Sequence, residues 1–196
     1  YSILKEVSKP HLNILTAEDP VEYELDGVGQ VQIKDDIGLS FAAALRSFLR
    51  QDPEIILVGE MRDKETAQAA MEAALTGHMV FTTLHANDTA TAITRLSEMN
   101  IPPYLIGASI IGVIAQRLVR KVCLSCSSVK VLKKGEDDRA IKYGLNKARI
   151  INESNNSSSK SCSVCGGSGY KGRIGIYEVM KINENLRELI MKESTA

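Results

Sequence analysis

Apolar residues in the first part of the chain form short unbroken runs separated by segments with helical spacing. The runs at residues 12–17, 55–58 and 79–84 are bounded by turn residues, which is typical of buried strands in a parallel sheet. Pro20 follows the first run and disfavours helix at the residue before it, so this strand ends in a loop. Residues 28–33 alternate in polarity and predict a further strand.

Helical spacing of apolar residues fills the segments between these strands. Helices are predicted over residues 41–49, 64–76 and 89–99, and from Pro102-Pro103 to about Leu118. Ser40 and Asp63 are suitable capping residues for the first two helices, and Gly77 ends the second. The N-terminal Tyr1 to Lys5 resembles the middle of a helix, and a short strand from Ile176 precedes an amphipathic C-terminal helix. Alternating strands and helices predict an α/β fold with a mainly parallel sheet.

Composition excludes several classes of protein. The 196 residues include 24 Lys+Arg and 24 Asp+Glu, so the net charge is zero and a generally basic nucleic-acid binder is not expected. An apolar fraction of 44% is enough to build a core, which argues against a disordered chain. No run of 18 uncharged apolar residues occurs, so no membrane span is predicted. The longest candidate, Leu105 to Ala115, has the length of a buried helix.

Four cysteines lie in two Cys-x-x-Cys pairs, Cys123 with Cys126 and Cys162 with Cys165. This spacing lets two thiolates reach one tetrahedral ion from a tight turn, and two such pairs favour a structural zinc site. Reduced or disulfide-linked cysteines are the alternative. The insert at residues 127–161 is rich in Lys and then in Ser, and its last part, residues 155–161, is predicted to be mobile.

Two predicted strands end in acidic residues. Glu60 follows the apolar run at 55–58, an arrangement that places a carboxylate where the Mg²⁺ of a nucleotide and an attacking water would lie. The pattern is weak alone, because many parallel strands end in an ordinary loop-capping acid. Glu18, Asp19 and Glu22 form a second acidic strand end, and two such ends repel unless a cation or an arginine lies between them.

Arg50 and Arg62 have the side chain suited to bidentate phosphate contacts, although a single arginine is more often a surface residue. His78 and His85 lie at the two ends of one predicted strand, about 23 Å apart when extended, so they would not share a metal ion. From the sequence alone, a structural role for these histidines and a role in sensing a phosphate or orienting a water are equally supported. No GxxxxGK[ST] motif occurs in the chain.

In combination, these residues resemble the GspE/PilB family of motor ATPases for type II secretion and type IV pilus assembly. The resemblance covers nearly the whole chain and rests on Glu18 to Tyr23, Leu49 to Pro53, Val58 to Asp63, Glu65 to Ala67, Thr76 to His78, Thr82 to Asn87, Ala115 to Arg120, the two cysteine pairs and Gly169 to Gly175. It implies a RecA-like core with helices on both faces of the sheet and a small tetracysteine zinc subdomain. The implied divisions are residues 1–120, 121–175 and 176–196.

The resemblance also implies roles for individual residues and a cellular setting. Glu22 would act as base or orient the attacking water, and Glu60 would support Mg²⁺ and that water, with Glu18 and Asp19 in the same acidic box. Arg50 and Arg62 would approach the phosphates from a neighbouring subunit, and His78 and His85 would form the histidine box. The implied cofactors are ATP, Mg²⁺ and Zn²⁺. The implied partners are further copies of the same chain in a homo-hexamer and a platform protein of the inner membrane. The implied location is the cytoplasmic side of that membrane.

Two further readings stay open. In the family, the phosphate-binding loop lies just before the segment that Tyr1 to Leu4 resembles. The chain is thus expected to start within the helix that follows this loop, and without the loop we expect it to bind ATP weakly or not at all. If the loop is truly absent from the parent, a non-catalytic zinc-binding interaction module is the better reading. A DNA-uptake motor on the same core is the other alternative.

Overall fold

The computed structural model describes residues 1–131, 142, 147–151 and 162–192. Contacts divide the chain into two compact units. The first unit combines Tyr1–Ala115 with Glu178–Ala196, and the second is Gln116–Tyr177. Each unit has its own secondary structure and is described separately below.

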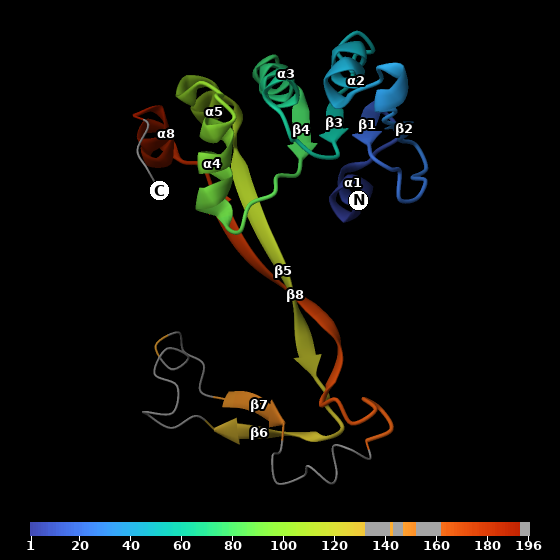
Figure 1. Cartoon of the computed structure of the whole chain (residues 1–196), viewed down its shortest axis with the longest axis vertical. Coiled ribbons are helices and arrows are strands. Elements are labelled where there is room, and N and C mark those ends of the chain that lie inside the picture. The colour runs from blue at the N-terminus through green and yellow to red at the C-terminus, as the bar shows by residue number, and fades with distance from the viewer. Residues whose placement is uncertain (132–141, 143–146, 152–161, 193–196) are drawn as a thin grey trace. The chain divides into compact units, whose positions relative to one another are not determined.

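A four-stranded parallel sheet forms the centre of the first unit (Figure 1). Its strands are β1 (Ile14–Glu18), β2 (Gly29–Gln32), β3 (Ile55–Val58) and β4 (Met79–Thr82), in the order β2-β1-β3-β4. The register pairs Ala17 with Val58 and Val58 with Thr82, so the carboxyl ends of three adjacent strands are level. The four predicted strands and the α/β class are confirmed.

Helices connect and flank the strands of the first unit. They are α1 (Ser2–Val7), the 3-10 turn η1 (Asp35–Ile37), α2 (Phe41–Phe48), α3 (Lys64–Leu75), α4 (Thr89–Glu98), α5 (Pro103–Ser109) and α8 (Glu184–Met191). Ser40 Oγ accepts a hydrogen bond from the Ala43 amide at 3.2 Å, and Asp63 Oδ1 accepts one from the Thr66 amide at 2.8 Å. Both predicted caps are therefore confirmed.

Helices cover both faces of the sheet because its strands are apolar on both sides. Ile56 and Val58 of β3 are fully buried in a large cluster with residues of α2, α3 and α5. Ile55, which points the other way, packs in a second cluster with Leu4 of α1 and Ile14 of β1. The sequence of a strand that is buried on both faces is an unbroken apolar run, as observed for β3.

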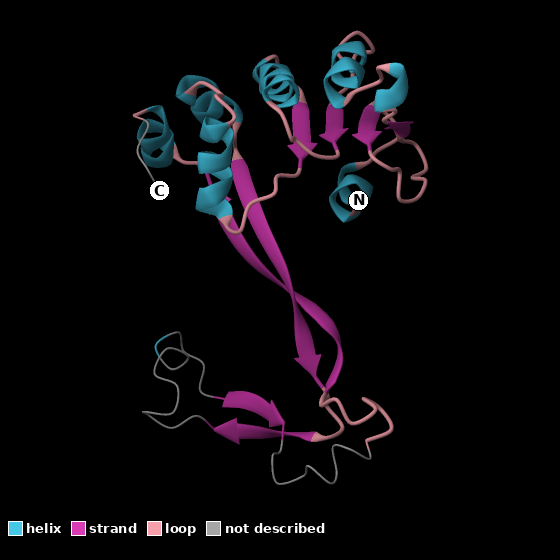
Figure 2. Cartoon of the chain, in the orientation of Figure 1, coloured by secondary structure: helices cyan, strands magenta, loops and turns pink. Residues whose placement is uncertain are grey.

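The predicted helix from Pro102-Pro103 to about Leu118 is wrong beyond Ser109. Helix α5 ends there, Ile110 is extended, and Gly112–Val122 forms strand β5 (Figure 2). β-Branched residues are concentrated after position 109, and they favour an extended backbone. The apolar segment Leu105 to Ala115 is thus half helix and half strand. Strand β8 (Tyr170–Lys181), which pairs with β5, is longer than the strand predicted from Ile176.

The second unit contains an antiparallel strand pair that was not predicted. Strands β6 (Ser127–Val131) and β7 (Lys147–Ile151) pair across the lysine-rich insert, with Val129 opposite Arg149. The predicted mobile segment, residues 155–161, lies outside the described residues. In the described part of the chain, every helix is too short or too polar to cross a bilayer.

Candidate functional site

The predicted acidic residues meet at one edge of the parallel sheet. Glu18 is the last residue of β1, Glu60 follows β3, and His85 follows β4. Because the three strands are parallel and adjacent, their carboxyl ends lie side by side (Figure 1). This edge is where open α/β sheets bind their ligands.

Glu60 is the enclosed member of a three-residue cluster. Its side chain is 12% exposed and forms an ion pair with Arg62 through Oε1. Its other oxygen, Oε2, lies 3.3 Å from His85 Nε2. The partners are much more open, with side-chain exposures of 62% for Arg62 and 86% for His85. The cluster thus presents one shielded carboxylate behind two side chains that solvent or a ligand can reach.

Backbone contacts fix the position of this carboxylate. The Gly59 amide donates to the Ala17 carbonyl at 2.8 Å, and the Met61 amide donates to the Thr83 carbonyl at 3.1 Å. The Thr83 hydroxyl donates to the Gly59 carbonyl at 2.7 Å. A Cβ at position 59 would lie 3.1 Å from the Ala17 carbonyl oxygen, so glycine permits the close approach of these strand ends. Thr83 was not predicted as a site residue, although it lies in the segment Thr82 to Asn87 that carries the family resemblance.

Glu18 is more deeply enclosed than Glu60 and accepts hydrogen bonds from three protein donors. It is 5% exposed and accepts hydrogen bonds from the Tyr1 hydroxyl, the Thr16 hydroxyl and Gln30 Nε2, the last at 3.0 Å. Burial and the hydrogen bond to Glu18 raise the pKa of Tyr1, so this phenol stays protonated and donates. These three donors leave one acceptor position on Oε2, and its burial limits the access of a cation to that oxygen.

The other two acidic residues of this box lie on the surface. Asp19 and Glu22 are exposed in the loop that follows β1. Within the described residues neither carboxylate forms an ion pair, while the Glu22 amide donates to the Tyr1 hydroxyl oxygen at 3.0 Å. Two exposed carboxylates therefore lie close in sequence to the enclosed Glu18 and are open to a cation or a water.

Arg50 and His78 lie at the opposite edge of the sheet from Glu60. Arg50 follows α2 and precedes the amino end of β3, where it is exposed. His78 precedes the amino end of β4, and its Nδ1 lies 2.9 Å from the Ala73 carbonyl oxygen at the end of α3. The structure therefore brings Arg62 and His85 to Glu60 within one chain and places Arg50 and His78 elsewhere.

The four cysteines of the second unit converge in one cluster. Their Sγ atoms all lie within 4.8 Å of one another, and Cys126 Sγ lies 3.6 Å from Cys165 Sγ. Cys123 is fully buried, and its amide donates to the Gly169 carbonyl at 2.9 Å. All four are free thiols. Their arrangement is one in which a single metal ion could be bound by four sulfurs.

The thiols of this cluster have divergent pKa values. Burial raises the pKa of Cys165, but hydrogen bonds from the Gly169 amide and the Cys162 thiol outweigh it and lower the pKa to about 6. Burial and the neighbouring thiols raise the pKa of Cys126 to about 12. Without a cation, thiolates this close repel each other, so the cluster cannot ionise fully. A divalent metal ion would remove that restriction.

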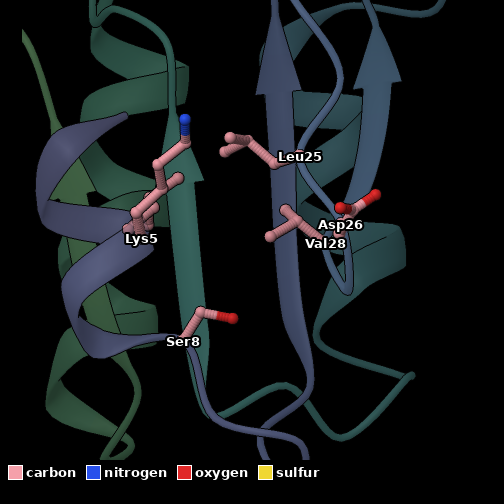
Figure 3. A pocket seen from close by; sticks show the side chains of 6 residues that line it. Lys5, Ser8, Leu25, Asp26 and Val28 are labelled. Atoms are coloured by element: carbon pink, nitrogen blue, oxygen red, sulfur yellow. The ribbon is translucent and has the colours of Figure 1, made fainter.

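A shallow pocket beside α1 contains none of the predicted site residues. Its lining is Leu4, Lys5, Ser8, Leu25, Asp26 and Val28. Figure 3 shows Leu25 and Val28 pointing toward α1, while the Asp26 carboxylate points away. The Lys5 ammonium lies 5.0 Å from the centre of the Tyr23 ring. With few convergent polar groups, this pocket is a weaker candidate than the strand ends.

Comparison with known proteins decides the family. All 196 residues match the family described as type II/IV secretion system protein. The chain belongs to this family. It is 50% identical over 196 residues to the type IV pilus assembly ATPase PilB of Thermus thermophilus, and 44% identical over 190 residues to the type II secretion system protein E of Dickeya dadantii. It spans 22% and 36% of the length of these two curated relatives.

Solved structures of two ATPases, one of them a pilus retraction motor, share this fold. The pilus retraction motor PilT with bound ADP matches 93% of the chain at 30% identity with a TM-score of 0.62, and the chain covers 42% of it. The ATPase DotB of Legionella pneumophila matches 97% of the chain at 26% identity with a TM-score of 0.63, and the chain covers 43% of it. The type II/IV secretion family member described here thus has the fold of these ATPases in the part that it spans.

Proposed function

We propose that this chain is the motor portion of an ATPase that drives type IV pilus assembly or type II protein secretion. The observation that carries the proposal is the enclosed Glu60 carboxylate at the carboxyl edge of the sheet, in contact with Arg62 and His85. The relatives named as pilus assembly and secretion proteins support the same conclusion. Because the chain spans less than two fifths of these relatives, the activity is proposed for the full-length protein.

Phosphoryl transfer requires little covalent chemistry from a protein, so its residues must position the reactants and stabilise charge. We assign Glu60 to the attacking water and the magnesium ion, and Glu22 to orienting that water or accepting its proton. Arg62 would leave its ion pair with Glu60, bind the phosphates and stabilise the charge that develops on them. During this change of partners, His85 would keep Glu60 in place through its contact with Oε2.

Magnesium fits the acidic residues of this edge, because Mg²⁺ prefers a small number of carboxylate ligands together with water and phosphate oxygens. Glu60 and the exposed Asp19 are the candidates, and Glu18 would support them from its buried position. When bound, the ion would neutralise charge on the nucleotide phosphates. The protein residues would hold the nucleotide and its water in line.

Arg50 and His78 fit a site shared between subunits. Both lie at the opposite edge of the sheet from Glu60, where they cannot contribute to the same chain's cluster. In a ring of identical subunits, the proposed homo-hexamer, such residues would face a neighbouring nucleotide and make turnover depend on assembly. The proposed location is the cytoplasmic side of the inner membrane, against a platform protein.

Zinc is the proposed ion of the cysteine cluster. A tetrahedral site with Zn–S bonds of about 2.3 Å requires sulfurs roughly 3.8 Å apart. The observed spacing, within 4.8 Å for every pair and 3.6 Å for Cys126 and Cys165, is close to that requirement. Because 35 residues separate the two cysteine pairs in sequence, the ion would act structurally by joining distant segments of the second unit.

The decisive experiment measures ATP hydrolysis by the full-length protein, since the present chain contains no GxxxxGK[ST] motif. Glu60→Gln and Glu22→Gln are each expected to lower kcat by about a hundredfold or more, because each removes a charge from the reacting centre. Glu72→Gln on the exposed face of α3 is the matched control and should retain full activity. Unchanged hydrolysis in both site variants would contradict the proposal and favour the non-catalytic interaction module.

A further inference from the structure

Glu178 near the end of β8 contacts the first turn of α4. Its Oε1 accepts a hydrogen bond from the Thr89 amide at 3.4 Å and a second one from the Thr89 hydroxyl. Thr89 is the first residue of α4 and is 3% exposed. Amides in the first turn of a helix lack intrahelical partners, and a carboxylate is the acceptor that the helix dipole favours there. The contact therefore fixes the beginning of α4 to β8.

The loop between β4 and α4, residues 83–88, is held at both ends. Thr83 fixes the β4 end through its hydroxyl bond to the Gly59 carbonyl and its carbonyl bond from the Met61 amide. Thr89 fixes the α4 end through Glu178. His85 lies between these two points.

The His85 ring depends on this loop for its position. Its side chain is 86% exposed, so packing does not restrain the ring, and its one hydrogen-bonding contact among the described residues is Glu60 at 3.3 Å. A side chain that packing does not hold can keep a catalytic distance only if its backbone is fixed. Loss of the Glu178 contact leaves the Asp88 cap on the Thr91 amide, at 2.7 Å, to hold the α4 end. The looser loop end increases the range of positions that the imidazole samples.

We propose that Glu178 is a positioning residue for the hydrolytic site, acting through Thr89 and the loop on His85. This inference rests on the proposed ATPase function. Among the described residues, Glu178 forms no hydrogen bond or ion pair with Glu60, Arg62 or His85. Its effect is on the fraction of time that His85 Nε2 lies within reach of Glu60 Oε2. Turnover therefore depends on the Glu178–Thr89 hydrogen bonds, whereas nucleotide affinity does not.

The test is steady-state ATP hydrolysis by the full-length protein. Glu178→Ala should lower kcat about fivefold and leave KM for ATP within about twofold, because misplacing a catalytic group affects turnover more than binding. Glu178→Gln retains an acceptor oxygen and should restore most of the lost kcat. A Gln variant as slow as the Ala variant would overturn the hydrogen-bonded link.

Asn183→Ala provides a matched control for helix capping. The Asn183 side chain caps α8 by accepting from the Leu186 amide at 2.9 Å, and among the described residues it forms no hydrogen bond with the loop at residues 83–88. It should lower the melting temperature about as much as Glu178→Ala while leaving kcat unchanged. If Asn183→Ala lowers kcat equally, the effect of Glu178 is general destabilisation and the inference fails.

A double-mutant cycle with His85→Ala tests the route of the effect. If Glu178 acts through His85, Glu178→Ala should lower kcat no further in the His85→Ala background. An equal fold-loss in both backgrounds would overturn the route.

The Glu60→Gln variant separates failure of this inference from failure of the proposed function. If Glu60→Gln abolishes hydrolysis and Glu178→Ala leaves kcat unchanged, only the present inference is wrong.

Discussion

The Tyr1 hydroxyl and the Glu18 carboxylate form a direct hydrogen bond across 17 positions of sequence. The same hydroxyl oxygen accepts from the Glu22 amide at 3.0 Å, so one phenol joins the end of β1 to the loop that carries the second acid of the box. The Tyr1 ring also packs edge-on against Tyr23, with ring centres 4.5 Å apart. The segment preceding β1 thus orders the acidic loop directly.

Removing this phenol should destabilise the first unit. Tyr1→Phe keeps the ring contact with Tyr23 but leaves Glu18 with two donors and the Glu22 amide without its acceptor. We expect the free energy of unfolding to fall by about 1.5 kcal/mol, the usual value for a hydrogen bond to a charged group. Urea denaturation measures this change.

Tyr104→Phe is the control for this substitution. Tyr104 is 62% exposed and its hydroxyl forms no hydrogen bond among the described residues, so its variant should unfold at the wild-type urea concentration. Equal stability of the Tyr1 variant and the control would show that Glu18 does not need its third donor.

His85 should contribute to turnover far more than to stability. His85→Asn removes the imidazole from Glu60 Oε2 while Arg62 remains paired with Oε1, so the fold keeps its ion pair. We expect kcat of the full-length protein to fall by about 10- to 100-fold, as is typical when a positioned histidine is lost. His11→Asn, on an exposed turn before β1, should be unaffected. A His85 variant with normal kcat would remove this residue from the site.

The central sheet could be predicted from sequence because its signals are local and agree with one another. The run at residues 55–58 is apolar on both faces, is bounded by turn residues and ends at an acid, and it forms β3 as expected. Ser40 and Asp63 likewise cap the helices that follow them. Where pattern, propensity and capping point to the same element, the prediction holds.

The segment around Ser109 could not be predicted in this way. The eleven-residue segment Leu105 to Ala115 has the length of a buried helix. The β-branched residues after position 109 favour a strand, and the pairing of β5 with β8, whose nearest ends Val122 and Tyr170 are 48 positions apart, decides between the two. Long-range pairing leaves no local signal. The separation of His78 and His85 follows from their positions at the two ends of one predicted strand, but the contact of His85 with Glu60 depends on the pairing of β3 with β4, which leaves no local signal either.

Metal binding should depend on the buried thiol of the cysteine cluster. Purified reduced protein is expected to contain about one zinc ion per chain, and Cys123→Ser should lose it, because oxygen replaces a sulfur at a fully buried position. Ser163→Ala, on an exposed residue inside the second cysteine pair, should retain the ion. Elemental analysis by mass spectrometry measures both. Wild-type protein with well under one ion per chain would contradict the zinc assignment.

Thiol alkylation should then distinguish the cysteines once the metal is removed with a chelator. The pKa of Cys165 is about 6, so at pH 7 this residue is mostly thiolate and reacts quickly, whereas Cys126, with a pKa of about 12, stays a thiol. Lowering the pH from 7 to 5 protonates Cys165 and should slow its alkylation roughly tenfold, while Cys126 stays slow throughout. Peptide mass spectrometry after brief iodoacetamide treatment reads each site separately. If the metal ion is bound by all four thiols, they should all be protected from alkylation before chelation. Equal rates at Cys126 and Cys165 after chelation would show that the arrangement of the cluster is lost when the metal is removed.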